Sequence, residues 1–164
     1  MKIFDSAINP RVFHDWHHFL AFGMGSGLAR KAPGTWGTLA AVPFCVLMWW
    51  CLPAWKLAVV MLIAAGAGVS MCERVARELG VHDHGGIVWD EWVGYGISLV
   101  ALPPLWFTPL AAFVVFRLFD IWKPWPISWC DKHLQGGVGI MLDDVLAGVL
   151  TCAVLNGLWW GVMT

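Results

Sequence analysis

The stretch APGTWGTLAAVPFCVLMWWCLPAW (residues 32–55) contains no charged residue and no histidine. It is long enough to cross a bilayer, which takes about 20 predominantly apolar residues in an α-helix. After the single charge of Lys56, the stretch LAVVMLIAAGAGVSMC (57–72) is again free of charge. Two such stretches in succession predict a helical membrane protein.

Two further apolar runs follow, at residues 92–116 and 145–164. Prolines interrupt the first of them, and proline breaks a helix because it lacks the backbone N–H and clashes with the preceding turn. We therefore expect two helices there, about Val88–Leu102 and Pro109–Trp122. The whole pattern predicts an all-α, multi-pass helical membrane protein with about five apolar helices, some short enough to require tilt or local bilayer thinning.

The composition agrees with a membrane protein. Only 13% of the 164 residues are charged and 59% are hydrophobic, whereas a soluble domain carries about 25% charged residues. The net charge of −1 gives no basic field for nucleic acid. Thirteen tryptophans against one tyrosine indicate anchoring at the membrane interface. These numbers exclude an ordinary soluble enzyme, a disordered chain and a DNA-binding module.

The length fits one domain, residues 1–164. Residues 1–31 are expected to form an N-terminal cytoplasmic or interfacial segment without a cleaved signal, in which Phe13 to Leu28 forms a lying or re-entrant helix. Nearly all loop cations fall on one side if the N-terminus is cytoplasmic, and only Lys56 falls outside. By the positive-inside rule, the loops that carry polar motifs therefore gather on the cytoplasmic face.

Polar clusters stand at the ends of the apolar runs. Gly34, Thr35 and Thr38 open the first run, where Pro33 can start a helix and a threonine can cap it. Free N–H groups at such a helix start bind phosphate readily. The alternative is a capped helix whose neighbouring cations lie on anionic lipid.

The second cluster is HDHGGIVWDE (82–91). Asp90 and Glu91 stand where an apolar helix begins, and a charge near the bilayer centre costs roughly 3 kcal/mol or more. We therefore expect both carboxylates to face an interior cavity and to be functional. His82 and His84 could bind zinc, but hydrogen bonding near the site is the favoured interpretation.

Arg117, Asp120 and Lys123 form the third cluster. Spacings of three residues place them on one helix face, either to bind phosphate or as an ion-pair ladder that lowers the cost of insertion. The fourth cluster is the adjacent pair Asp143 and Asp144. Two neighbouring carboxylates repel, so a nearby cation is expected; a structural role is the alternative.

Together these clusters place carboxylates and cations at helix ends on one membrane face. Oxygen-only ligands favour a hard cation, magnesium before calcium or zinc. A metal and phosphate-binding cations beside lipid predict phosphoryl chemistry on a lipid headgroup.

Four motifs carry a family resemblance: APGTWGT (32–38), HDHGGIVWDEWVG (82–94), FRLFDIWKPWPI (116–127) and GGVGIMLDDVLAG (136–148). In this order they closely resemble the phosphatidylglycerophosphatase A family, from about residue 19 to residue 148. The resemblance implies a magnesium-dependent enzyme of the bacterial inner membrane. Its substrate would be phosphatidylglycerophosphate in the bilayer, and its products phosphatidylglycerol and inorganic phosphate.

We assign roles from the chemistry of each group. The predicted Mg²⁺ ligands are carboxylates: Asp90, Glu91, Asp143 and Asp144. The predicted phosphate-binding groups are cations and helix-start donors: Arg117, Lys123, Gly34, Thr35 and Thr38. Asp120 is either a further ligand or the base that orients water, and His82 or His84 could protonate the leaving oxygen.

Two alternatives stay open. One of the aspartates could act as a nucleophile and form an aspartyl-phosphate. From a different class, the carboxylates could line the pathway of a small cation-coupled transporter, which predicts acidic residues near mid-span and on both faces. The oligomeric state and the number of metal ions are left open.

Overall fold

The computed structural model describes residues 9–81 and 84–163, and over these residues it is entirely helical. The expected all-α class is confirmed. The elements in chain order are α1 (Asn9–His14), α2 (Trp16–Ala21), the 3₁₀ helix η1 (Gly23–Leu28), α3 (Pro33–Cys51), α4 (Ala54–Leu79), α5 (Trp89–Ser98), α6 (Thr108–Trp122), α7 (Ile127–His133) and α8 (Gly136–Met163).

Three helices in the described part of the chain are long and apolar enough to cross a membrane: α3, α4 and α8. The expected five spans are not confirmed, because α5 and α6 are too short. At 1.5 Å per residue they extend about 15 Å and about 22 Å, against a hydrocarbon core of about 30 Å. The chain leaves the helical path between them at Leu99, and Ala101 has a positive φ of 59°.

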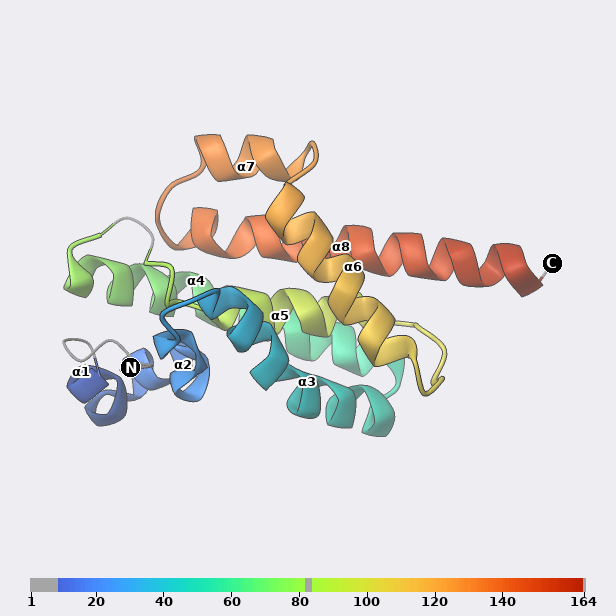
Figure 1. The fold of residues 1–164 in the computed structure, drawn as a ribbon, viewed down its shortest axis with the longest axis horizontal. Coiled ribbons are helices and arrows are strands. Elements are labelled where there is room, and N and C mark those ends of the chain that lie inside the picture. The colour runs from blue at the N-terminus through green and yellow to red at the C-terminus, as the bar shows by residue number, and fades with distance from the viewer. Residues whose placement is uncertain (1–8, 82–83, 164) are drawn as a thin grey trace.

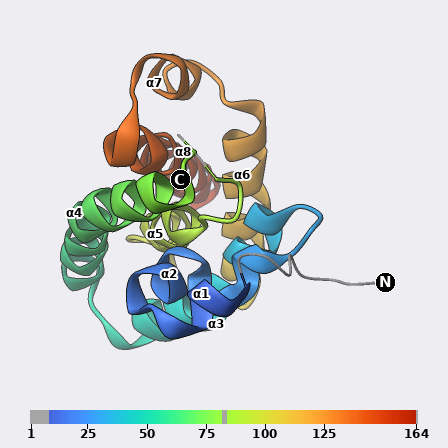
Figure 2. The same ribbon diagram turned by 90° about the vertical axis from the view of Figure 1, so that its left-hand side faces the viewer.

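The short helix α5 lies at the centre of the bundle, with α3, α4, α6 and α8 packed around it (Figures 1 and 2). Nearly all of its side chains are buried. Two hydrogen bonds tie it to neighbours, from Trp89 Nε1 to the Ala64 carbonyl and from Tyr95 Oη to the Pro109 carbonyl, both 3.1 Å long. The residues at the start of α5 are therefore held in a fixed place inside the bundle.

The helix bounds differ from the expected ones at two places. α4 does not end near Cys72 but continues to Leu79, where Gly80 terminates it in a left-handed conformation. α8 begins at Gly136 rather than near Val145. Its first turn lies against α4, so closely that a Cβ on Gly137 would overlap the Val69 carbonyl. Asp143 and Asp144 consequently lie within α8, two turns from its start.

Residues 13–28 do not form one lying or re-entrant helix. They belong to three short helices, α1, α2 and η1, which lie beside the carboxyl end of α4 and the start of α3 (Figure 2). Val12, Ala21 and Phe22 are fully buried there and join the core that includes Cys72 and Val75 of α4. The N-terminal segment is thus packed into the protein over its described residues.

The closest approach between α5 and α8 occurs at two glycines. A Cβ on Gly148 would overlap the backbone of Gly94, and a Cβ on Gly94 would lie 2.6 Å from the Asp144 carbonyl. The absence of side chains here lets the two backbones meet. This contact sets the distance between Glu91 on α5 and Asp144 on α8.

We expect Gly148→Ala to destabilise the protein by about 1–3 kcal/mol, the usual cost of overpacking a core. Gly157→Ala is the matched control, because no described atom lies within 4 Å of a Cβ on Gly157. The measurement is the thermal unfolding midpoint of each purified variant in detergent. Equal midpoints for the two variants would contradict the importance of the α5–α8 contact.

Candidate active site

Four helices bring polar side chains together inside the bundle: the start of α3, the start of α5, the end of α6 and the first part of α8. Gly34 makes room for this convergence. A Cβ at Gly34 would overlap Glu91 Oε1 and would lie 3.1 and 3.2 Å from the two terminal nitrogens of Arg117. The structure therefore brings the APGTWGT stretch against Glu91 and Arg117, which are far apart in sequence.

Arg117 is the central cation of the site. Its Nη1 forms an ion pair with Asp120 and lies 3.8 Å from Glu91 Oε1. The same guanidinium donates to the hydroxyls of Thr38 and Thr35 at 3.5 and 3.4 Å, which are long for hydrogen bonds. These weak contacts leave its donors available for a stronger acceptor such as a phosphate oxygen.

Asp90, Glu91 and Asp144 form a three-carboxylate group. Each offers one oxygen, and the three oxygens lie within 4.8 Å of one another. Glu91 and Asp144 are 9% and 3% exposed, and Glu91 Oε2 and Asp144 Oδ1 have no hydrogen-bond partner among the described residues. Buried carboxylate oxygens without donors are costly, so this group is suited to bind a cation.

Burial, and after it the charge of Asp144, raise the pKa of Glu91 to about 8, although the Asp90 hydrogen bond and the charge of Arg117 act in the opposite direction. Asp144 in turn interacts electrostatically with Asp120 and Asp90. Four carboxyl groups therefore interact with one another, and the Arg117 guanidinium pairs with two of them, Glu91 and Asp120. A divalent cation would relieve this repulsion, and hard oxygen ligands of this kind suit Mg²⁺.

Asp143 lies apart from the three-carboxylate group. Its Oδ2 accepts from Lys123 Nζ at 2.8 Å, and Lys123 forms a second ion pair with Asp131 of α7. Burial acts to lower the pKa of Lys123, but the hydrogen bonds to Asp131 and Asp143 raise it above its usual value. The metal-binding role assigned to Asp143 stays a prediction, and its observed partner is a lysine.

Asp131 was missed from the sequence. It stands eight residues after Lys123, across Pro124 and Pro126, and no helical spacing relates the two. No sequence pattern distinguishes it from an ordinary surface aspartate, because only the placement of α7 brings it to Lys123.

The structure gives less direct support for the roles predicted for the histidines. His84 Nδ1 accepts from the Gly86 N–H at 3.1 Å, and its ring contacts the ring of Phe22. It lines a cavity of about 220 Å³ together with Arg30 and Pro33 at the start of α3. Its predicted role as proton donor stays a prediction, and His82 lies outside the described residues.

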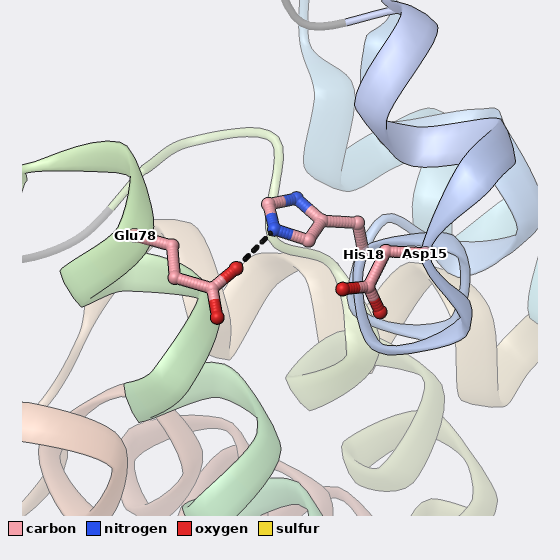
Figure 3. A group of neighbouring side chains, drawn as sticks. All are labelled: Asp15, His18 and Glu78. Carbon is pink, nitrogen blue, oxygen red and sulfur yellow. Dashed lines mark hydrogen bonds and ion pairs between the residues drawn. The ribbon is translucent and has the colours of Figure 1, made fainter.

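A second cluster lies at the carboxyl end of α4. Asp15, His18 and Glu78 offer ligand atoms within 4.8 Å of one another (Figure 3). His18 Nε2 and Glu78 Oε2 are 2.9 Å apart. Hydrogen bonds from His17 lower the pKa of Asp15, the backbone N–H of His17 contributing most.

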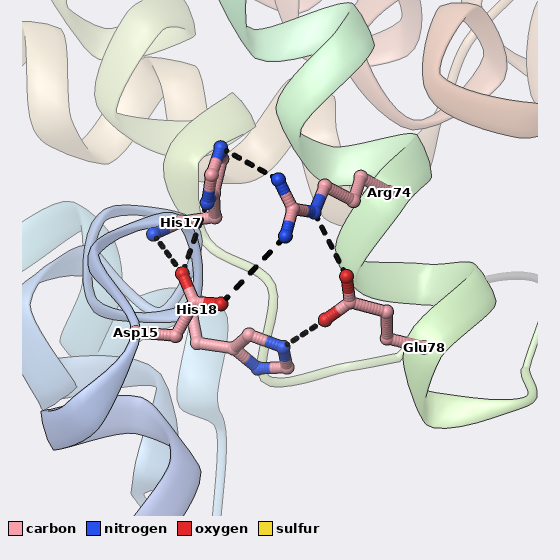
Figure 4. Close-up of polar contacts among 5 residues, drawn as sticks. All are labelled: Asp15, His17, His18, Arg74 and Glu78. Atoms are coloured by element: carbon pink, nitrogen blue, oxygen red, sulfur yellow. Dashed lines mark hydrogen bonds and ion pairs between the residues drawn. The ribbon is translucent and has the colours of Figure 1, made fainter.

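Arg74 already occupies this second cluster. It donates from Nε to Glu78 at 2.8 Å and lies 3.9 Å from Asp15 and 3.1 Å from His17 Nε2 (Figure 4). Its guanidinium faces both carboxylates, as a metal ion would. The network is therefore best explained as a structural connection that holds α2 against α4.

Three helices long and apolar enough to cross a membrane, together with a site of carboxylates, arginine and lysine, define a membrane protein with a carboxylate group that could hold a metal ion. The sequence model of Phosphatidylglycerophosphatase A matches residues 19–159. The chain belongs to this family of lipid phosphatases, which confirms the resemblance of the four motifs.

Curated relatives support the assignment. The chain is 49% identical over 147 residues to Phosphatidylglycerophosphatase A of Escherichia coli (strain K12), covering 88% of this chain and 84% of the relative. It is 46% identical over 139 residues to the protein of the same name from Haemophilus influenzae, covering 84% and 85%. A putative phosphatidylinositol-3-phosphatase of Bacteroides thetaiotaomicron is 36% identical over 146 residues, covering 84% and 90%. No solved structure shows a significant match.

Gly34→Ala should reduce the rate of phosphate release from phosphatidylglycerophosphate about 100-fold, because its methyl group would displace the Glu91 carboxylate and the Arg117 guanidinium, and small misplacements of catalytic groups cost this much. Gly85→Ala is the control, since no described atom lies within 4 Å of a Cβ there. Inorganic phosphate released by the two purified variants is the readout. Full activity in Gly34→Ala would mean that this space is not used in catalysis.

Proposed function

We propose that this chain hydrolyses the terminal phosphate monoester of phosphatidylglycerophosphate to phosphatidylglycerol and inorganic phosphate, at the site between α3, α5, α6 and α8. The observation that carries the proposal is the pair of buried, unpartnered carboxylate oxygens on Glu91 and Asp144, next to Arg117. Membership of the family and the names of two relatives support the substrate.

Mg²⁺ is the proposed cofactor, with Asp90, Glu91 and Asp144 as its ligands. The residues fit such an ion because they supply oxygen donors only, and two of these donors have no other partner among the described residues. When bound, Mg²⁺ would neutralise charge on the phosphate oxygens and lower the pKa of a bound water. Asp143 is proposed to act at the edge of this group, through its pair with Lys123.

The chain's own residues position the phosphate. Hydrolysis of a phosphate monoester proceeds through a loose transition state, so orientation and charge neutralisation supply most of the catalysis. The Arg117 guanidinium would donate to the equatorial phosphate oxygens, and its long bonds to Thr35 and Thr38 can yield to them. Lys123 and the N–H groups at the start of α3 would bind the remaining oxygens.

Proton transfer completes the reaction. A water oxygen attacks phosphorus, the bond between phosphorus and the glycerol oxygen breaks, and the water proton passes to Asp120. The ion pair with Arg117 fixes the position of the Asp120 carboxylate for this role. His84 is the proposed donor of the proton that the leaving glycerol oxygen takes up, from the imidazolium form. The neutral ring that remains is the form whose Nδ1 accepts from the Gly86 N–H.

The acyl chains of the substrate would stay in the bilayer while the headgroup enters the polar end of the bundle. The positive-inside rule supports a cytoplasmic position for this end, since Lys56 stands at the opposite end of α4 from Arg74 and Arg77. The proposed location is the bacterial inner membrane. Among the described residues, Asp90, Glu91 and Asp144 form one compact group rather than a series on both faces of the membrane, which favours an enzyme over a cation-coupled transporter.

Asp144→Asn should reduce phosphate release at least about 100-fold and weaken its dependence on Mg²⁺, because even partners of metal ligands cost about 10- to 100-fold when removed. Asp15→Asn, the same change in the distant network of α2, should retain activity. Release of inorganic phosphate across a Mg²⁺ titration is measured for both. Wild-type activity in Asp144→Asn would remove the carboxylate site from the mechanism.

Direct hydrolysis and an aspartyl-phosphate intermediate that water opens at its acyl carbon differ in where the water oxygen goes. In a single turnover in ¹⁸O-labelled water with enzyme in excess, direct hydrolysis places the label in the released phosphate. Mass spectrometry of the phosphate and of the digested protein reads out both fates. Label in an enzyme carboxylate would replace the direct reaction by the covalent one.

A further inference from the structure

Asp131 is the one partner of Lys123 that lies outside the four motif clusters. It stands on α7, a helix held against α8 by the buried side chains of Ile127 and Cys130. From there its carboxylate forms an ion pair with Lys123 Nζ. A separately anchored element thus reaches a cation of the proposed phosphate site.

Lys123 needs a second contact to have a defined position. It is the C-cap residue of α6 and has a left-handed conformation with φ of 45°. Its long side chain has many rotamers. Asp143 alone would draw the ammonium against α8 at 2.8 Å. Asp131 attracts it from the α7 side, so the nitrogen lies between the two carboxylates.

We propose that Asp131 is a positioning residue for phosphate binding. Its carboxylate and that of Asp143 each accept one N–H of the Lys123 ammonium, so that the third N–H can be directed at a phosphate oxygen of the substrate. The proposal rests on the proposed role of Lys123 as a phosphate ligand. It assigns to α7 the function of placing that lysine.

A purely structural ion pair accounts less well for this arrangement. Asp131 is exposed and Lys123 is partly exposed, and exposed pairs contribute little to stability. The apolar contacts of Ile127 and Cys130 already anchor α7. Loss of the Asp131 carboxylate should therefore weaken substrate binding while leaving folding intact.

The first test is Asp131→Asn, assayed with phosphatidylglycerophosphate in mixed micelles. We expect kcat/KM to fall about tenfold, mainly through KM, as for other groups that orient a binding residue. Asp131→Glu should recover most of the loss, and Lys132→Gln, on the same helix, should match the wild type. An unchanged KM in Asp131→Asn, or equal losses in Lys132→Gln, would overturn the proposal.

A double-mutant cycle separates this proposal from the one on which it rests. If Asp131 acts through Lys123, then Asp131→Asn has no further effect on KM in a Lys123→Ala background. Additive effects would refute the positioning role. If Lys123→Ala alone leaves KM unchanged, the role of Lys123 in phosphate binding fails first, and that of Asp131 fails with it.

Discussion

The repulsion among Asp90, Glu91, Asp120 and Asp144 is the interaction on which the rest of the structure depends. These carboxyl groups interact with one another inside an apolar bundle, where charges interact strongly, and a single guanidinium pairs with two of them, Glu91 and Asp120. Nearly every other polar feature of the site offsets this repulsion. Arg117 lies among the carboxylates, Lys123 neutralises the neighbouring Asp143, and a divalent cation would supply the charge still missing.

The fold brings these groups together by means of a helix that is too short to span the membrane. α5 is too short to cross a bilayer, but it is surrounded by longer helices and so carries Asp90 and Glu91 into the bundle. Glycines at 34, 94 and 148 allow the neighbouring helices to approach it closely. The site is consequently formed by side chains on rigid elements, which is the arrangement that precise positioning of a phosphate requires.

The sequence predicted this site where local spacing carried the information. The three-residue spacing of Arg117 and Asp120 predicted their pairing, and the carboxylates beside apolar runs predicted a buried group. Contacts between elements that are far apart along the chain could not be predicted from the sequence. Nothing in the sequence separates Gly148, which meets α5, from Gly157, which meets no described atom, and nothing links Asp131 to Lys123 or Glu78 to His18. The first turn of α8 lies against α4 at Gly137, a tertiary contact that periodicity does not encode.

The most direct measurement of the central claim is equilibrium binding of Mn²⁺, a paramagnetic substitute for Mg²⁺, followed by electron paramagnetic resonance of the free ion. The purified wild-type protein should remove Mn²⁺ from solution, and Mg²⁺ should compete for it. Glu91→Gln and Asp144→Asn should each lose this binding, whereas Asp15→Asn in the second cluster should retain it. Binding that persists in both site variants, or is lost only in Asp15→Asn, would contradict the assignment of the cation to the carboxylates of α5 and α8.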